Sequence, residues 1–263
     1  MVALACSDPA EHELPLCRWT IRTLHRAAVD LGHVRSIAAE TVRRWMAIAD
    51  LKLHRFTSWL HSTDPRFEER MSEVVGLYGD ALHGKLVYCI DERTSMQALE
   101  RFRPDLPTRP GLIRRREFHY RRHGTLTPFG CFEVATGIMR GRCCQRHRGQ
   151  QFVEFLGWLV RQLPADRELH FVLDNYATHK TKQVQQFLAG HQGRVQFHFT
   201  PTHASWLNQI ELWLSTLTRR VLQPGNFTSR EHLQCTVLDF IDYHNRHDAR
   251  PYRWTYTGQP REV

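Results

Sequence analysis

The sequence predicts an α/β protein, with a mixed five-stranded sheet flanked by helices and preceded by a small all-helical region. Three observations support this. Apolar residues near the N-terminus recur at three- and four-residue spacing, as on amphipathic helices. Further along, short β-favouring runs alternate with helical segments in the order β-β-β-α-β-α-β-α. Hydrophobic residues at 41% and charged residues at 24% are ordinary globular values, so the chain can bury a core.

Residues 1–66 are expected to form a helix-turn-helix region and a linker. Helical spacing runs from Arg18 to Leu31 and stops at Gly32, and Ser36 is the candidate N-cap of a second helix reaching Ala49. The second helix of such a motif enters the DNA major groove. A plain helical hairpin is the alternative, because residues 1–80 carry ten basic and eleven acidic residues. The candidate DNA contacts on the second helix are Thr41, Arg43 and Arg44.

Residues 67–80 predict another helix, and the apolar run 86–90 predicts a buried strand closed by Asp91 and Glu92. Two further strands are expected over 126–136 and 137–144, with a glycine at the break, as in a hairpin. The first three strands can then form a meander.

Helix and strand alternate in the second half of the chain. We expect helices over 150–163, 205–222 and 229–245, and strands over 170–173 and 195–199. Residues 175–180 are expected to lead into a further helix that reaches Ala189. If the first and fourth strands pair side by side, Asp91 and Asp174 emerge at one edge of the sheet, where ligands commonly bind. The helix after the fifth strand can bring Glu211 to the same place.

These three acids are candidate metal ligands. Each alone could be a turn residue, a helix cap or a solvent-facing side chain. Together they would repel one another unless cations neutralise them. Carboxylate oxygens suit Mg²⁺ or Mn²⁺, and two such ions can support an in-line phosphoryl displacement. The sequence therefore predicts a metal-dependent phosphoryl-transfer site at Asp91, Asp174 and Glu211.

Positive charge is concentrated in one block. Of the net charge of +9, residues 81–150 account for +8, with fourteen basic and six acidic residues. Arginine suits bidentate contact with phosphate, so a polyanion is the expected partner, although a solvated loop is the alternative. The arginines proposed to bind DNA here are Arg114, Arg115, Arg116, Arg121 and Arg122.

Other classes of protein are disfavoured. No apolar run reaches the ~18 residues of a membrane span, and acidic residues interrupt the N-terminus before a signal core could form. The seven cysteines include no CxxC pair and are expected to be reduced thiols in a cytosol. The glycines form neither a P-loop nor a GxGxxG motif, so no organic cofactor is expected.

Four segments carry a family resemblance: Cys89–Glu92, Arg121–Thr125, Leu173–Lys180 and Thr200–Glu211. In them the chain resembles the transposases of bacterial insertion sequences in the mariner-like superfamily. The resemblance implies a ribonuclease H-like domain over 67–263 whose catalytic acids match Asp91, Asp174 and Glu211. Asn175 and His179 also match and would support the site. Thirty-six residues separate Asp174 from Glu211, slightly more than the commonest spacing.

The same resemblance implies the reaction and its partners. With two Mg²⁺ or Mn²⁺ ions, water would hydrolyse a phosphodiester at the transposon end, and the freed 3′-hydroxyl would attack target DNA, typically at a TA dinucleotide. The implied partners are terminal inverted repeats, target DNA and a second copy of the chain, at least in the synaptic complex. The expected location is the bacterial cytoplasm, in association with the nucleoid and not with a membrane.

Two alternatives stay open: a catalytically silent, truncated remnant that only binds DNA, and a ribonuclease H-like, structure-selective nuclease that acts on RNA–DNA hybrids or junctions. Family members usually begin with two helix-turn-helix motifs, whereas about eighty residues precede the first catalytic strand here. The expectation is that the chain begins inside the second motif.

Overall fold

The computed structural model describes residues 1–53, 64–145, 148–191 and 193–254. The chain divides into two compact units, Met1–His61 and Ser62–Val263, and each has its own hydrophobic core. None of the described helices combines the length and the apolar character that a membrane crossing requires.

The first unit consists of short helices around a small core. Thr20 begins the second α-helix with a capping box, because its hydroxyl accepts the N–H of Thr23 while the Thr23 hydroxyl accepts the N–H of Thr20. The apolar side chains of Leu24, Val42 and Met46 meet in the core. The elements are α1 (Val2–Cys6), η1 (Pro9–His12), α2 (Ile21–Asp30) and α3 (Ala39–Ile48).

The predicted cap at Ser36 is wrong. Helix α3 begins at Ala39, and its N-cap residue, Ala38, has no side chain that could cap it. The turn before α3 is instead held by α2, because the Val34 N–H donates to the Ala28 carbonyl and the His25 ring contacts the Ile37 carbonyl at 2.7 Å.

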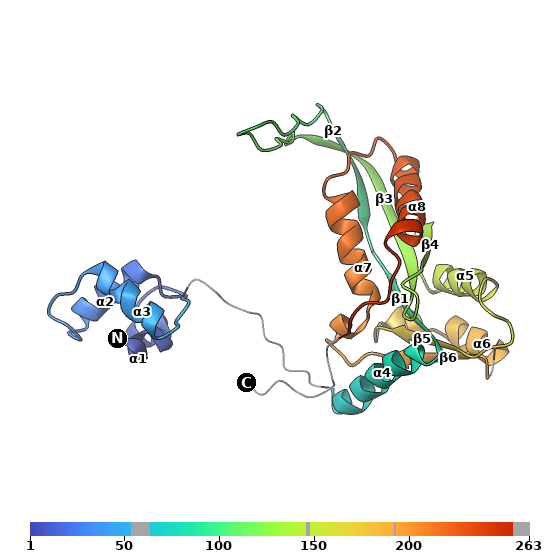
Figure 1. Ribbon diagram of the computed structural model, residues 1–263, viewed down its shortest axis with the longest axis horizontal. Coiled ribbons are helices and arrows are strands. Elements are labelled where there is room, and N and C mark those ends of the chain that lie inside the picture. Colours follow the sequence, from blue (N-terminus) through green and yellow to red (C-terminus); the bar gives the residue numbers. More distant parts are fainter. Residues whose placement is uncertain (54–63, 146–147, 192, 255–263) are drawn as a thin grey trace. The chain divides into compact units, whose positions relative to one another are not determined.

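The second unit is built on one mixed sheet (Figure 1). Its strand order is β2-β3-β1-β5-β6, and β4 pairs with β3. Strand β3 runs antiparallel to its neighbours β1, β2 and β4, whereas β1, β5 and β6 are parallel. The strands are β1 (Leu86–Glu92), β2 (Met96–Arg101), β3 (Tyr120–Glu133), β4 (Met139–Cys144), β5 (Leu169–Leu173) and β6 (Val195–Phe199).

The sheet has six strands and not the predicted five. Strand β2 has no long apolar run, because it buries only Met96 and Ala98 and ends in partly exposed polar residues. It is completed by the first half of β3, where Arg121 and Arg122 stand opposite Glu100 and Leu99. The predicted Arg-rich loop is therefore partly strand. Pairing across the sheet outweighs the low β-propensity of these residues.

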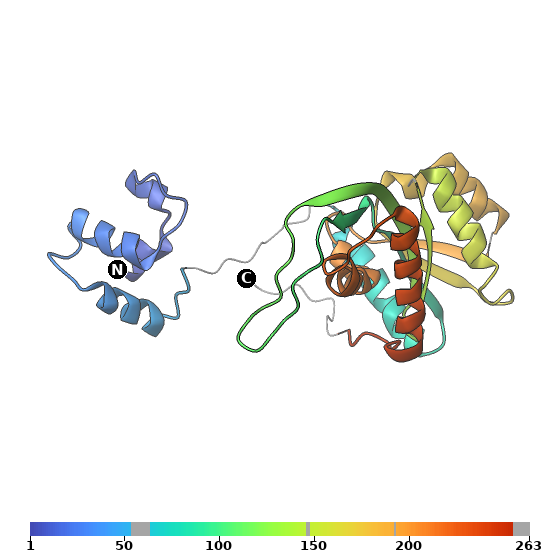
Figure 2. The same ribbon diagram turned by 90° about the horizontal axis from the view of Figure 1, so that it is seen from above.

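Helices cover both faces of the sheet (Figure 2). Helices α4, α7 and α8 share one apolar cluster with it, and α5 and α6 share the other. The mixed α/β class is confirmed. The helical elements are α4 (Phe67–Leu82), α5 (Gly149–Val160), η2 (Ala177–Lys180), α6 (Lys182–Gly190), η3 (Ser205–Leu207), α7 (Ile210–Leu217), η4 (Thr218–Leu222) and α8 (Arg230–His247).

The helix expected over 205–222 is interrupted. The side chain of Asn208 is fully buried and its Nδ2 donates to the Ile90 carbonyl at 3.0 Å, so the chain turns between η3 and α7. This turn ties the start of α7 to the last residue before Asp91.

Residues 102–119 connect β2 to β3 and project from the sheet as an arm (Figure 2). Isolated bridges join Leu106 to Arg115 and Arg109 to Leu112 across the arm. Several of its apolar side chains are exposed: Phe102, Leu106, Leu112, Ile113 and Phe118.

Candidate active site

Asp91, Asp174 and Glu211 line one cavity of about 620 Å³. Asp91 lies near the end of β1, Asp174 directly follows β5, and Glu211 lies in the first turn of α7. Because β1 and β5 are neighbouring parallel strands, their carboxyl ends meet at one edge, as predicted. Arg93 and Arg101 line the same cavity.

Asp91 is a buried carboxyl group, 8% exposed. Burial, and then repulsion from Glu92, Asp174 and Glu211, raise the pKa of Asp91 to about 8. One interaction opposes this, because the Glu92 N–H donates to Asp91 Oδ1 at 2.7 Å. A bound cation would therefore stabilise the charged form of Asp91 strongly.

A glycine lets Glu211 reach this position. Gly130 of β3 stands opposite Asp91, and a Cβ built there would lie 2.9 Å from Ile210 Cδ1 and 2.4 Å from Met139 Cε. The missing side chain allows α7 to lie against the sheet at the level of Asp91. The pKa of Glu211 is raised by burial and by Asp174, with Arg93 acting in the opposite direction.

His179, on η2, holds Asp174. Its ring is 1% exposed, its Nδ1 lies 2.9 Å from Asp174 Oδ1, and its Nε2 lies 3.3 Å from Glu92 Oε2. Burial acts to lower the pKa of His179, but the hydrogen bonds to Asp174 and Glu92 outweigh it and raise the pKa to about 10. The imidazolium is thus a fixed cation between two carboxylates, and the ring of Phe152 packs on it at 4.5 Å.

The side chain of Asn175 contacts the loop after β6 and the end of η2. Its Nδ2 donates to the Thr202 hydroxyl at 3.2 Å, and its Oδ1 accepts from the Lys180 ammonium. In these contacts it fixes the backbone next to Asp174.

The three acids supply only oxygen donors, which are the ligands that Mg²⁺ and Mn²⁺ prefer. Within the described ranges, no three His, Cys, Asp or Glu side chains form a ready-made metal group. The carboxylates share a cavity without converging, as expected of like charges that repel one another. The donor chemistry and the raised pKa of Asp91 fit a site for divalent cations.

Sequence reasoning gave no role to Glu92 and Arg93. Glu92 is the second partner of His179, and Arg93 lines the cavity beside Glu211. Their position in the sequence was the available signal, because Glu92 directly follows Asp91 at the end of a buried strand and Arg93 is the next residue.

The predicted DNA contacts of the first unit lie on α3. Arg43 and Arg44 are exposed and Thr41 is half-buried. Arg43 forms an ion pair with Glu40 at 2.6 Å, in which both side chains are largely exposed, so water and phosphate can compete for the guanidinium.

The predicted arginines of the arm have different surroundings. Arg114 and Arg116 both pair with Asp105, at 2.6 and 3.2 Å, and Arg116 also donates to the carbonyls of Gln223 and Pro224. Arg116 therefore ties the arm to the chain after η4. Arg115 is exposed.

Arg121 and Arg122 lie on the exposed half of β3. Their guanidinium groups stack over the rings of Phe102 and Tyr120, at 5.9 and 5.5 Å from the ring centroids. These contacts leave the edges of both groups able to bind phosphate.

Comparison with known proteins adds three findings. Residues 86–234 match the family described as DDE superfamily endonuclease. A curated relative, the insertion element IS630 uncharacterized 39 kDa protein of Shigella sonnei, is 22% identical over 226 residues. The alignment covers 81% of this chain and 62% of that protein, so the chain spans less than two thirds of the relative's length.

The third finding is a likeness to solved structures. The Mos1 strand transfer complex is similar with a TM-score of 0.53 at 14% identity, over 89% of this chain and 75% of that one. The Mos1 mariner paired end complex with Mn has a TM-score of 0.51 at 14% identity, over 85% and 86% of the two chains. These likenesses agree with the ribonuclease H-like fold expected for the second unit.

Proposed function

Because its matched residues cover more than half of its length, the chain belongs to the DDE superfamily endonucleases, and we propose that it is a transposase. It would cleave DNA at the ends of an insertion sequence and join those ends to target DNA. One observation carries the proposal: three carboxylates, in β1, directly after β5 and on α7, line a single cavity in which burial and neighbouring acids raise the pKa of Asp91 and Glu211.

Asp91, Asp174 and Glu211 would hold two Mg²⁺ or Mn²⁺ ions. When bound, such ions activate an attacking oxygen and stabilise the leaving oxygen of a phosphodiester. The related paired end complex was solved with Mn, which supports this choice of cation.

The chain's own side chains would prepare the site. His179 would orient Asp174 and hold Glu92 in place, because its ring contacts both carboxylates. Arg93 and Arg101 line the cavity and would attract the scissile phosphate. Asn175 would support Asp174 through the backbone that they share.

DNA would also contact the chain outside the cavity. We assign phosphate contact to Arg114 and Arg115 of the arm and to Arg121 and Arg122 of β3, and give Arg116 a structural part. Thr41, Arg43 and Arg44 would face DNA from α3. The matched structures are DNA-end and strand-transfer assemblies of a related fold, which supports terminal repeats and target DNA as the partners.

A second copy of the chain is the further proposed partner. The arm exposes Ile113 and Phe118 to 83% and 84%, so two large apolar side chains of one connection are available for a protein contact. Two copies would also allow two transposon ends to be held at once.

A strand-transfer assay tests the proposal. A labelled duplex that ends at the element boundary with a free 3′-hydroxyl is incubated with the protein, Mn²⁺ and a supercoiled plasmid. We expect label joined to the plasmid, with insertions at TA. Hydrolysis of the duplex without joining would point to a nuclease, and binding without either product to a silent remnant.

A further inference from the structure

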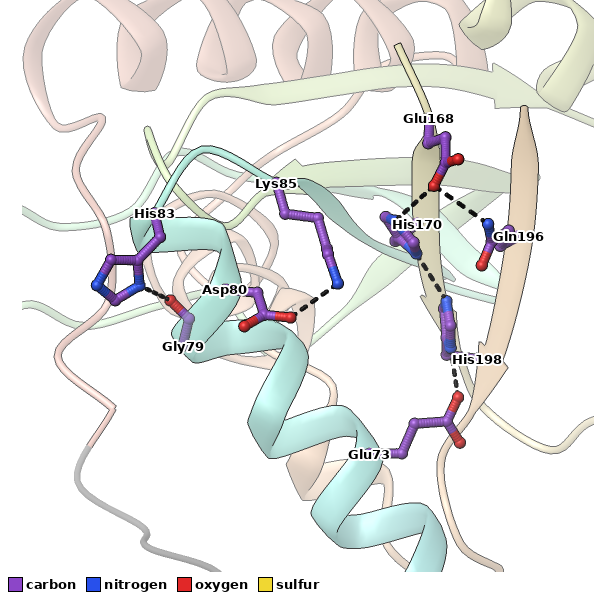
Figure 3. Close-up of polar contacts among 9 residues, drawn as sticks. All are labelled: Glu73, Gly79, Asp80, His83, Lys85, Glu168, His170, Gln196 and His198. Atoms are coloured by element: carbon purple, nitrogen blue, oxygen red, sulfur yellow. Dashed lines mark hydrogen bonds and ion pairs between the residues drawn. The ribbon is translucent and has the colours of Figure 1, made fainter. Parts of the chain in front are cut away.

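Helix α4 contacts both β6 and the chain that runs from β6 to α7. In Figure 3, Glu73 of α4 meets His198 of β6, with 2.5 Å between Oε1 and Nδ1. Further along α4, the buried Tyr78 hydroxyl donates to the Leu207 carbonyl at 2.6 Å. Both contacts pack α4 against this part of the second unit.

A third contact comes from Asp64, three residues before α4. Its side chain is 6% exposed and its carboxylate pairs with Arg70 Nη1 at 2.7 Å. It also accepts the N–H groups of Arg66 at 3.0 Å and of Thr202 at 3.2 Å. These N–H groups hold the pKa of Asp64 below its usual range. A carboxylate this enclosed is stable only with such partners.

Thr202 links Asp64 to the candidate active site. Its hydroxyl accepts from Asn175 Nδ2 at 3.2 Å, and Asn175 directly follows Asp174. The start of the same loop continues the sheet, because the Thr200 N–H donates to the Leu173 carbonyl at 2.8 Å. The loop after β6 and the loop after β5 are therefore joined behind Asp174.

We propose that Asp64 is a positioning residue: it fixes Thr202 and, through Asn175, holds Asp174 in place at the end of β5. The catalytic half of this inference rests on the proposed function. Its structural half rests on the contacts alone and is testable without activity.

The test compares Asp64→Asn with Glu73→Gln, which removes a contact between α4 and β6 but leaves the contact of Asp64 with Thr202 in place. For Asp64→Asn we expect kcat for cleavage of end DNA to fall about 10- to 100-fold, because small misplacements at a reacting centre have effects of this size. More Mn²⁺ should be needed for half-maximal rate, whereas KM for DNA stays unchanged. Glu73→Gln should keep kcat within about twofold.

Hydrogen exchange supplies the readout that is independent of activity. Asp64→Asn should speed the exchange of amides in residues 174–180 and 200–204, and Glu73→Gln should not. If Asp64→Asn does not fold, Thr202→Val replaces it, because this change removes the hydroxyl that accepts from Asn175 and should also speed exchange at 174–180.

Unchanged exchange at 174–180, or equal losses of kcat in the Asp64 and Glu73 variants, would overturn the inference. If the wild-type protein cleaves no DNA, the proposed function fails, while the exchange measurement still decides whether Asp64 holds the loop.

Discussion

Two buried ionisable side chains at the ends of β1 and β5 have opposite preferences. Burial and neighbouring acids keep the proton on Asp91, whereas two carboxylates keep the proton on His179. In the folded protein the charged form of Asp91 is therefore disfavoured, whereas the charged form of His179 is favoured. This contrast is what a site built for added cations would show, because His179 already satisfies Asp174 while Asp91 has no cationic partner among its described contacts.

Asp91→Asn should therefore stabilise the protein while abolishing cleavage. The native pKa of about 8 lies above the ordinary value of 3.8, so the native state binds more protons than the unfolded state between these values and stability falls as pH rises through that window. Asp91→Asn removes the titrating carboxyl group, so the variant should not lose stability in this way as pH rises. We expect its Tm to match wild type near pH 4 and to exceed it by about 3 °C or more at pH 8, where ~1 kcal/mol corresponds to ~2–4 °C.

Thermal melts across pH 4–8 without divalent cations check this, and a second series with Mn²⁺ is the control. Mn²⁺ should raise the Tm of the wild type more than that of Asp91→Asn. A Tm difference that does not change with pH would contradict the account of Asp91.

At the scale of elements, the contact of α7 with β3 decides where Glu211 lies. Gly130→Ala should push α7 from the sheet, because the new Cβ would overlap Ile210 and Met139. We expect a loss of roughly 1–3 kcal/mol in stability, typical of overpacking, and a loss of cleavage greater than the loss of folded protein.

Gly76→Ala on α4 is the matched control, because nothing lies within 4 Å of its Cβ position. In a helix interior this change should stabilise by up to about 1 kcal/mol. Denaturant unfolding and cleavage rates are measured for both variants. Equal activity per folded molecule in Gly130→Ala and wild type would show that α7 does not set the position of Glu211.

Two arginines of the arm should behave differently when they are replaced, because one is proposed to contact phosphate and the other holds the arm in place. Arg115→Ala should weaken binding to all duplexes alike and reduce the salt slope by about 0.9, the value for one phosphate contact. Arg116→Ala should instead loosen the base of the arm, because Arg116 holds Asp105 and the carbonyls after η4. Anisotropy titrations at several salt concentrations with two unrelated duplexes measure both. A loss confined to one DNA sequence would contradict the phosphate assignment of Arg115.

At the scale of the whole molecule, the arm is also the surface proposed to meet a second copy. Ile113→Asp combined with Phe118→Asp should leave the fold intact, since both side chains are exposed, and should convert complexes with end DNA from two protein chains to one. Analytical ultracentrifugation with labelled DNA reads the stoichiometry. Two chains per complex in the double variant would assign the contact to another surface.

Much of this architecture was predictable from sequence. Compact apolar runs predicted β6 and the two parallel strands β1 and β5, which place Asp91 and Asp174 at one edge of the sheet. Each of these runs is followed closely by an acid or a proline. Strand β2 did not, because its residues become strand only through pairing with β3. The roles of Asp64 and Arg116 depend on partners more than a hundred residues away, which no local pattern contains.

We propose that Asp91, Asp174 and Glu211 form one metal-dependent cleavage site. The most direct test of this claim is a gel assay of a labelled duplex that carries the element's end, with Mg²⁺ or Mn²⁺, for wild type and Asp174→Asn. We predict nicking at the element boundary that needs the metal and is absent in the variant, with DNA binding nearly unchanged. Binding by folded wild-type protein without any nicking, or equal nicking by Asp174→Asn, would contradict the claim.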